Sequence, residues 1–254
     1  MKKSKVLVFS IALIGYDQIF QHCIDSHRAY CRKYGYDYVL IDKFPGIPDK
    51  EEATWLKIVL MIEALKSSYD WVFFVDSDCE IRNHTPRLEE IQVINKYIYL
   101  APGHSGYINA GILIAKSSSE AIHYFEKVLD SAQQEIPELS IVDWGDNPYI
   151  IHHAKENPDI YLLTHDWNNN TNLDSQSYIF HYSSGTFRAF YLEKYASRIS
   201  QTKGKILRKI YNTYLRNFPK RNTFRSRMDD YRDFYTSRYA AFQKQTSTAG
   251  VSVS

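Results

Sequence analysis

The sequence of 254 residues is long enough for one large domain, or for one domain with an appendage, and its 44% hydrophobic content can fill a sizeable core. A formal net charge of only +2 gives no overall field that would attract nucleic acid, so no nucleic-acid partner is expected. Three cysteines are too few, and odd in number, for a disulfide framework, which favours a reducing, cytoplasmic compartment.

The first half of the sequence alternates short apolar runs with amphipathic segments. The apolar run at residues 5–13 is too short to span a bilayer and is interpreted as a first buried strand. A helix is predicted over residues 16–34, where apolar side chains recur at steps of three and four, and Gly35 ends it. A second helix is predicted to start with Thr54 as its cap and to end near residue 66. The other predicted strands of this half are residues 36–41 and the wholly apolar residues 71–75.

The second half continues the same alternation. Ser117 and Ser118 are placed to cap a helix that runs to residue 130, and Asn147 followed by Pro148 is a typical start for a helix ending near residue 155. Strands alternating with helices predict right-handed crossovers and a mostly parallel α/β sheet that is covered on both faces. The predicted strands of this half are residues 97–101, 111–115, 160–164 and 178–182.

The composition changes near residue 203. Nine Lys or Arg and no acid lie between Lys203 and Arg227, and residues 205–218 are predicted to form a basic helix. This segment is interpreted either as a peripheral contact with an anionic membrane, at its inner face, or as a solvated cationic surface. We therefore expect three parts: a domain at residues 1–200, a basic helical extension at 201–243 and a disordered tail at 244–254.

The strongest local pattern is an apolar strand that ends in Asp76-Ser77-Asp78. In open α/β sheets, ligands bind beyond the carboxyl ends of the strands. Two carboxylates at such a place repel each other unless a cation lies between them, and a divalent metal ion could also bridge to a diphosphate. The simpler alternative is a solvated turn, which Asp favours.

His181 lies at the end of another predicted strand. Its imidazole could complete a mixed oxygen and nitrogen coordination sphere with the two carboxylates, which favours Mn²⁺ over Mg²⁺. A single histidine is more often a partly buried polar residue, and the sequence leaves that alternative open.

Three further groups are candidates for contacts with a ligand. Asn109-Ala110-Gly111 precedes an apolar strand, where the amide could bind sugar hydroxyls and the small pair would let the backbone approach a ligand, or where it simply forms a turn. Asp146 directly precedes a helix and could point into a cleft, with Asp143 as the competing carboxylate, whereas Asn147 is sufficiently explained as a helix cap. Lys57 could reach phosphates or remain a solvated helix lysine.

Taken together and in this order, these motifs resemble the GT-A glycosyltransferases. The likeness is closest to two retaining groups: the galactosyl/mannosyl/xylosyltransferases, and the group of glycogenin and the lipopolysaccharide galactosyltransferases. It extends over roughly residues 5–190. The motifs that carry it are WLK at residues 55–57, YDWVFFVDSDCEI at 69–81, NAGILIAKSS at 109–118, DN at 146–147, DWNNN at 166–170 and FHYSSG at 180–185.

The resemblance implies a role for each motif. Asp76, Ser77 and Asp78 are similar to the Asp-x-Asp segment that holds Mn²⁺, or Mg²⁺, together with the nucleotide ribose and phosphates, and His181 is similar to the third metal ligand. The segment similar to the one that lines the donor sugar is Asn109, Ala110 and Gly111.

The resemblance also implies roles for residues that depart from the usual pattern. Asp146-Asn147 is similar to an Asp-Gln or Glu-Gln pair beside the anomeric carbon, with an amide one methylene shorter. In place of the usual Gly-x-x-Lys-Pro-Trp, this sequence has Gly185-Thr186-Phe187-Arg188, so Arg188 is expected to replace the phosphate-binding lysine with a planar guanidinium.

The expected function is therefore metal-dependent transfer of a hexose from a nucleotide sugar, with UDP-galactose or UDP-glucose as first choices, to a glycan or glycolipid, with retention. Two alternatives remain open. A sugar nucleotidyltransferase would usually show a glycine-rich loop after the first strand, where this chain has only Gly15. A non-catalytic nucleotide-sugar or glycan-binding protein would keep the pocket without turnover.

Overall fold

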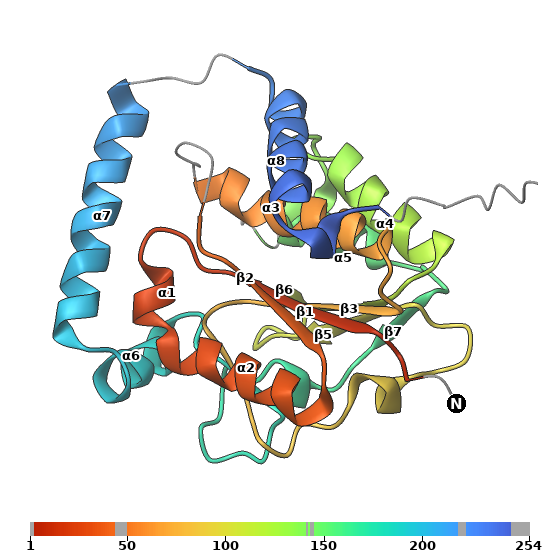
Figure 1. Cartoon of the computed structure of the whole chain (residues 1–254), viewed down its shortest axis with the longest axis horizontal. Coiled ribbons are helices and arrows are strands. Elements are labelled where there is room, and N and C mark those ends of the chain that lie inside the picture. The colour runs from red at the N-terminus through yellow and green to blue at the C-terminus, as the bar shows by residue number, and fades with distance from the viewer. Residues whose placement is uncertain (1–2, 44–49, 141, 143–144, 218–221, 245–254) are drawn as a thin grey trace, which may run out of the picture.

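The computed structural model describes residues 3–43, 50–140, 142, 145–217 and 222–244. A six-stranded sheet runs through the centre of the molecule in the order β2-β1-β3-β6-β5-β7 (Figure 1). The strands of this sheet are β1 (Val6–Ile11), β2 (Asp37–Ile41), β3 (Trp71–Val75), β5 (Ile98–Pro102), β6 (Ile108–Lys116) and β7 (Ile160–Leu162).

The sheet is mostly parallel, as predicted, with β6 as its one antiparallel strand. The cause is the short link between β5 and β6. That link is a tight turn in which Gly103 and Tyr107 are hydrogen-bonded at 2.8 Å and Gly106 has a φ of 79°. A parallel neighbour would need a long crossover connection, and this turn is too short to form one. Strand β6 therefore pairs with β5 as an antiparallel hairpin.

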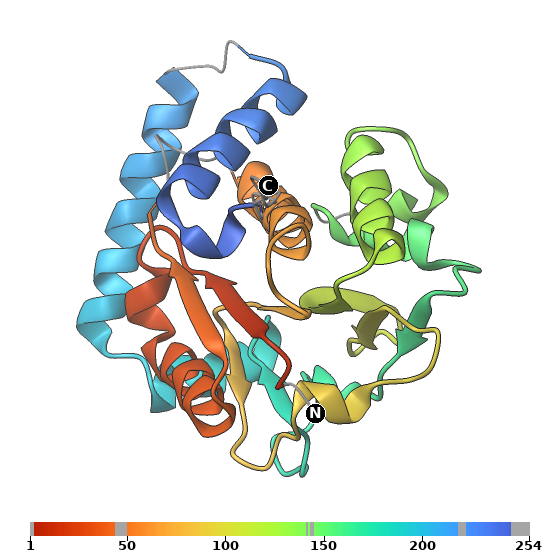
Figure 2. The same ribbon diagram turned by 45° about the vertical axis from the view of Figure 1, so that its right-hand side comes forward.

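Helices cover both faces of the sheet (Figures 1 and 2). The face under α2 (Gln21–Tyr34) buries Val8, Phe73 and Val75, while the opposite face buries alternate residues such as Phe9 and Phe74. This alternation is the two-residue period of a strand buried on both sides. The helices on the second face are α3 (Lys50–Leu65), α4 (Ser119–Asp130), α5 (Asn147–Ala154) and α8 (Phe224–Arg238).

Two helices of the first half differ from the sequence prediction. The predicted helix over residues 16–34 is broken at Phe20 into α1 (Tyr16–Ile19) and α2, which ends at Gly35 as expected, with a φ of 69°. Helix α3 begins at Lys50 rather than after Thr54, which lies inside it. Glu52 lies before Thr54, and an acid is favourable in the first turn of a helix, so the helix extends to the N-terminal side of Thr54.

A second, two-stranded sheet pairs β4 (Cys79–Ile81) with β8 (Ile179–His181) in antiparallel register. The register sets Cys79 opposite His181. The predicted strand at residues 178–182 therefore exists but belongs to this small sheet. Because β8 pairs with β4, His181 lies directly beside the segment that follows β3.

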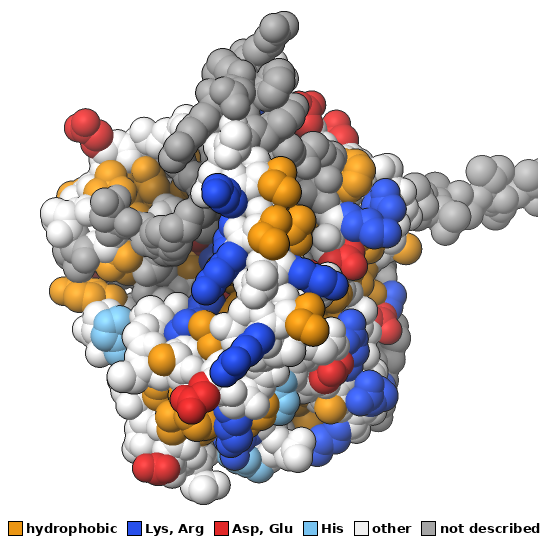
Figure 3. All heavy atoms as spheres, turned by 90° about the vertical axis from the view of Figure 1, so that its left-hand side faces the viewer, with side chains coloured by type: hydrophobic (Ala, Val, Ile, Leu, Met, Phe, Trp, Pro, Cys, Tyr) orange, Lys and Arg blue, Asp and Glu red, His pale blue; other side chains and the backbone are white. Residues whose placement is uncertain are grey.

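The C-terminal region forms α6 (Gly185–Lys194), α7 (Arg198–Asn217) and α8. The basic helix α7 begins earlier than the predicted residue 205 and packs against α1, whereas α8 packs against α3. Figure 3 shows basic and apolar side chains exposed together over α7. The exposed apolar residues of α7 include Ile199, Ile206, Leu207 and Ile210. Of the tail expected at residues 244–254, all but residue 244 lies outside the described residues.

Within the described part of the chain, none of the helices combines the length and the apolar composition that crossing a membrane requires.

Candidate functional site

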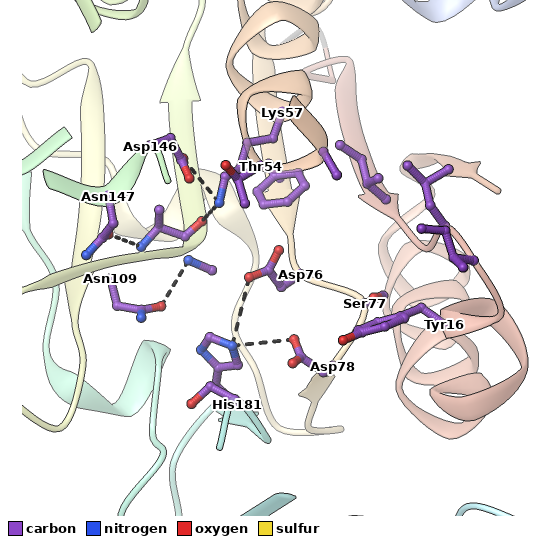
Figure 4. A pocket seen from close by; sticks show the side chains of 18 of the residues that line it. Tyr16, Thr54, Lys57, Asp76, Ser77, Asp78, Asn109, Asp146, Asn147 and His181 are labelled. Carbon is purple, nitrogen blue, oxygen red and sulfur yellow. Dashed lines mark hydrogen bonds and ion pairs between the residues drawn. The ribbon is translucent and has the colours of Figure 1, made fainter. Parts of the chain in front are cut away.

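A cavity of about 580 Å³ opens at the carboxyl ends of β1 and β3 (Figure 4). Eleven of the twelve residues singled out from the sequence line it: Lys57, Asp76, Ser77, Asp78, Asn109, Ala110, Gly111, Asp146, Asn147, His181 and Arg188. The twelfth, Gly185, is exposed at the start of α6 with a φ of 57°, so the need for glycine there is explained by its backbone conformation. Asp143 lies outside the described residues.

Two carboxylates and one imidazole converge in this cavity. His181 Nε2 lies 3.4 Å from Oδ1 of Asp78 and 3.9 Å from Oδ2 of Asp76 (Figure 4). Asp76 and Asp78 follow β3, and His181 ends β8, so the pairing of β4 with β8 brings the three together across about a hundred residues of sequence. The distance between His181 and Asp78 is therefore short enough for both to contact one ion.

The tautomer of His181 suits a metal ligand. Its Nδ1–H donates to Oδ1 of the buried Asn168 over 2.8 Å, so Nε2 is the ring nitrogen that faces the carboxylates. Asn168 in turn donates to Oδ1 of Asn109 over 3.2 Å. The sequence singled out Asn168 only as part of the DWNNN motif, because a hydrogen bond between distant segments leaves no pattern along the chain.

Gly111 lies against the imidazole of His181. A Cβ on Gly111 would lie 2.4 Å from Cε1 of His181, which is closer than any real contact. The absence of a side chain at Gly111 thus makes room for the imidazole, and Gly111 also lines the cavity.

The two carboxylates differ in acidity. Burial, with the nearby Asp78 charge, raises the pKa of Asp76, although Lys57 opposes the rise. Burial acts in the same direction on Asp78, but His181 and Arg188 outweigh it and bring the pKa of that carboxyl to about 2. Arg188 Nη2 donates to Oδ2 of Asp78 over 2.5 Å.

The donor set fits a divalent cation. Two carboxylates and a neutral imidazole form the mixed oxygen and nitrogen set that suits Mn²⁺. Cys79 also lies close to Asp78 and His181, with ligand atoms all within 4.8 Å of one another. However, burial raises the pKa of the Cys79 thiol well above its ordinary value, so it stays protonated, and Asp76 is the better third ligand.

A buried ion pair lies on the other side of the cavity. Lys57 Nζ is 3.2 Å from Oδ2 of Asp146 and donates to the carbonyl of Ala110 over 3.1 Å. Burial raises the pKa of Asp146 to about 6, while Lys57 opposes that rise. Asp146 and Lys57 both face the cavity, as the sequence analysis allowed for each of them (Figure 4).

Asn147 is not the helix cap that the sequence predicted. Asp146 occupies the N-cap position of α5, and Asn147 is the first helical residue. Its Oδ1 accepts from the Ala110 N–H over 2.8 Å, and its Nδ2 donates to the Ile108 carbonyl over 3.1 Å. Its amide thus fixes β6 against α5, since both polar atoms are bonded to the backbone of that strand.

Some residues that line the cavity are not predicted from the sequence, including Tyr16, Thr54, Arg208 and Asn212. Arg208 and Asn212 come from α7, a basic segment in which the sequence does not distinguish residues that face the cavity from residues that face solvent. Only the packing of α7 on α1 shows which cations of that run face the cavity.

The structure of this chain is similar to several solved structures, which identify its fold. A glycosyltransferase involved in the glycosylation of the major capsid of PBCV-1 is 12% identical, with a TM-score of 0.58 over 74% of this chain and 98% of its own. The galactosyltransferase LgtC, in complex with donor and acceptor sugar analogues, is 12% identical, with a TM-score of 0.52 over 78% and 99%. The glycosyltransferase GlyE of Streptococcus pneumoniae TIGR4 is 16% identical, with a TM-score of 0.52 over 86% and 66%. The fold is the GT-A fold, as predicted.

A sequence family also matches part of the chain. Residues 3–98, which include Asp76 and Asp78, match the galactosyl transferase GMA12/MNN10 family. A search of curated proteins finds no match. The resemblance drawn from the sequence is thereby confirmed, and with it the class of enzyme, a glycosyltransferase.

Proposed function

We propose that the protein transfers a hexose from a nucleotide sugar to a glycan or glycolipid acceptor and requires Mn²⁺, or Mg²⁺, to do so. One observation carries the proposal: Nε2 of His181, in the tautomer that can bind a metal, faces Asp76 and Asp78 in one cavity. A divalent cation held by these three residues would supply Lewis acidity toward the leaving diphosphate. UDP-galactose and UDP-glucose are the first donors to test, since the matching family and LgtC are described as galactosyltransferases.

Other residues that line the cavity are proposed to have separate roles in the reaction. Asn109, Ala110 and Gly111 are proposed to line the donor sugar, with Asn147 holding Ala110 in place. Asp146 is proposed to stabilise positive charge on the sugar carbon as its bond to the diphosphate breaks. Lys57 and Arg188 are proposed to balance negative charge near the phosphates, Lys57 beside Asp146 and Arg188 beside Asp78.

The ion pair between Asp146 and Lys57 favours retention of configuration. An inverting route needs a carboxylate that is free to deprotonate the acceptor. The carboxylate of Asp146 is buried and lies 3.2 Å from the Lys57 ammonium, which opposes that role. A front-side retaining route needs no protein base. The anomeric configuration of the product, read by proton NMR, tests this choice.

A donor screen tests the proposed activity. The protein is incubated with Mn²⁺ and single nucleotide sugars, and the released nucleotide is measured. Release of nucleoside diphosphate with at least one donor, abolished by EDTA and by Asp78→Ala, is expected. Pyrophosphate-dependent chemistry would instead support a sugar nucleotidyltransferase. Silence with every donor, together with tight donor binding, would support a non-catalytic binding protein.

We also propose that the enzyme works in the cytoplasm at the inner face of a membrane. The exposed apolar residues Ile199, Ile206 and Ile210 lie on one stripe of α7 at helical spacing, among basic side chains (Figure 3). A helix with an apolar stripe and a basic surround binds the surface of anionic membranes. Such a contact would hold the enzyme close to a glycolipid acceptor. The three buried free cysteines are consistent with a reducing compartment.

A further inference from the structure

Helix α7 forms part of the wall of the cavity. Arg208 and Asn212, one turn apart on this helix, line the cavity together with Tyr16 of α1. The guanidinium of Arg208 lies over the ring of Tyr16, 5.7 Å from its centre. A segment that looks like an appendage in the sequence thus contributes a cation to the site.

The position of Arg208 is fixed by close packing one turn earlier. Gly204 of α7 lies against Gly15 and Ile19, and a Cβ on Gly204 would be 2.6 Å from Cδ1 of Ile19. A Cβ on Gly15 would be 3.4 Å from Cα of Gly204. The backbones of Gly15 and Gly204 therefore approach closely, and the direction of the Arg208 side chain follows from this contact.

The charges in the cavity single out Arg208. Among the lining residues that were described, Lys57 lies beside Asp146 and Arg188 beside Asp78, so each of these cations already has a carboxylate partner. Arg208 makes no ion pair with any described carboxylate, and the Tyr16 ring does not neutralise its charge. Among the described residues that line the cavity, Arg208 is thus the cation for which no carboxylate partner is seen.

We infer that Arg208 binds the diphosphate of the nucleotide and that α7 is therefore part of the donor site. This inference rests on the proposed function. When the bond between the sugar carbon and the diphosphate oxygen breaks, its electron pair stays on that oxygen, and the nucleoside diphosphate gains one negative charge. A guanidinium presents paired N–H groups that match phosphate oxygens, so Arg208 stabilises this charge better than an ammonium would.

The test is a comparison of nucleotide affinities by calorimetry. UDP, UMP and uridine are titrated, in the presence of Mn²⁺, into the whole protein and into R208Q and R208K, and GDP is titrated into the whole protein. The loss of one charge-assisted contact should weaken UDP binding by R208Q about tenfold or more. UMP should be weakened less and uridine not at all, with R208K between R208Q and the wild type. K203Q, on the same helix but away from the cavity, should bind UDP within about twofold of the wild type.

Each outcome has a distinct meaning. UDP binding by R208Q within twofold of the wild type would overturn the inference while leaving the proposed function intact. Equal weakening of UDP, UMP and uridine would place Arg208 at the base and also overturn it. A wild-type protein that binds neither UDP nor GDP would contradict a nucleotide site itself. Unchanged circular dichroism of R208Q would show that lost affinity is not lost folding.

Discussion

At the scale of single residues, the orientation of the imidazole of His181 depends on one buried amide. Asn168 fixes the tautomer of His181 and is itself held by Asn109, so it acts on the proposed metal site through His181 rather than as a ligand. Removal of such an outer partner typically costs about 10- to 100-fold in metal affinity. We expect this loss of Mn²⁺ affinity for Asn168→Ala, measured by electron paramagnetic resonance titration of free Mn²⁺.

A neighbouring asparagine provides the control for this prediction. Asn170 makes only long contacts with His104 and Ser183, at 3.4 Å each. Asn170→Ala should therefore leave Mn²⁺ affinity within about twofold of the wild type. Equal affinities for the Asn168 and Asn170 variants would show that the tautomer of His181 does not govern metal binding.

A second residue, His27, links α2 to β1 and β4 and makes stability depend on pH. Its Nε2–H donates to the Cys79 carbonyl over 2.6 Å, and its Nδ1 lies 3.0 Å from Ser10 Oγ. Burial lowers the pKa of His27 from 6.5 to about 4. As pH falls from 6.5 to about 4, His27 becomes protonated in the unfolded chain but stays neutral in the folded chain. The contribution of His27 to stability is therefore intact above pH 6.5 and falls by up to about 3 kcal/mol as pH reaches 4.

Urea unfolding at several pH values between 7 and 4 checks this expectation. His27→Gln keeps a donor for the Cys79 carbonyl but does not titrate. The difference in unfolding free energy between wild type and variant should shrink as pH falls. A difference that stays constant across this range would show that the folded protein protonates His27 as readily as the unfolded chain does.

At the scale of helices and strands, the sequence predicts which segments gather at the site but not how they contact. Asp76 and Asp78 follow the end of β3, where the element order alone predicts a site. Asn109 lies at the start of β6 and joins them only because β6 is antiparallel to β3. The antiparallel direction of β6 follows from the length of one turn, and the position of His181 follows from the register between β4 and β8. Register and side-chain hydrogen bonds are set by packing between distant segments, which no local pattern encodes.

The surface of α7 gives a prediction that belongs to this scale. Sedimentation with vesicles containing anionic phosphatidylglycerol should carry down the wild-type protein, and less of it as salt is raised. The double substitution Ile206→Glu and Ile210→Glu removes apolar contact and adds repulsion, so we expect sedimentation to fall by about tenfold or more. Ile94 is 83% exposed and lies outside α7, so Ile94→Glu is the matched control and should sediment normally. Equal sedimentation of all three proteins would rule out α7 as the membrane contact.

At the scale of the whole molecule, the C-terminal helix α8 packs into the same hydrophobic core as the central sheet. Helix α7 runs along one side of the fold, and α8 then packs on α3 over the central sheet (Figure 1). Met228 and Tyr235 of α8 are buried in the same cluster as Phe9 and Phe74 of the sheet. The expected boundary at residue 200 therefore separates two stretches of sequence whose side chains share one core.

This shared core predicts that α8 unfolds together with the sheet. Met228 is 1% exposed, so Met228→Ala should lower the free energy of unfolding of the whole protein by about 2–5 kcal/mol, whereas Asp230→Ala, at an exposed position of α8, should change it by less than about 0.5 kcal/mol. Far-ultraviolet circular dichroism, which follows the helices, and tyrosine fluorescence, which follows packing, should give coincident urea transitions in both variants. If Met228→Ala instead produced an early transition that removes only part of the helical signal and leaves UDP binding in place, residues 201–243 would be a separate folding unit. In the sequence, α1 precedes α7 and α8 follows it. Coincident transitions would mean that α1 and α8 belong to one cooperative structure, which therefore holds α7 in place as a wall of the cavity.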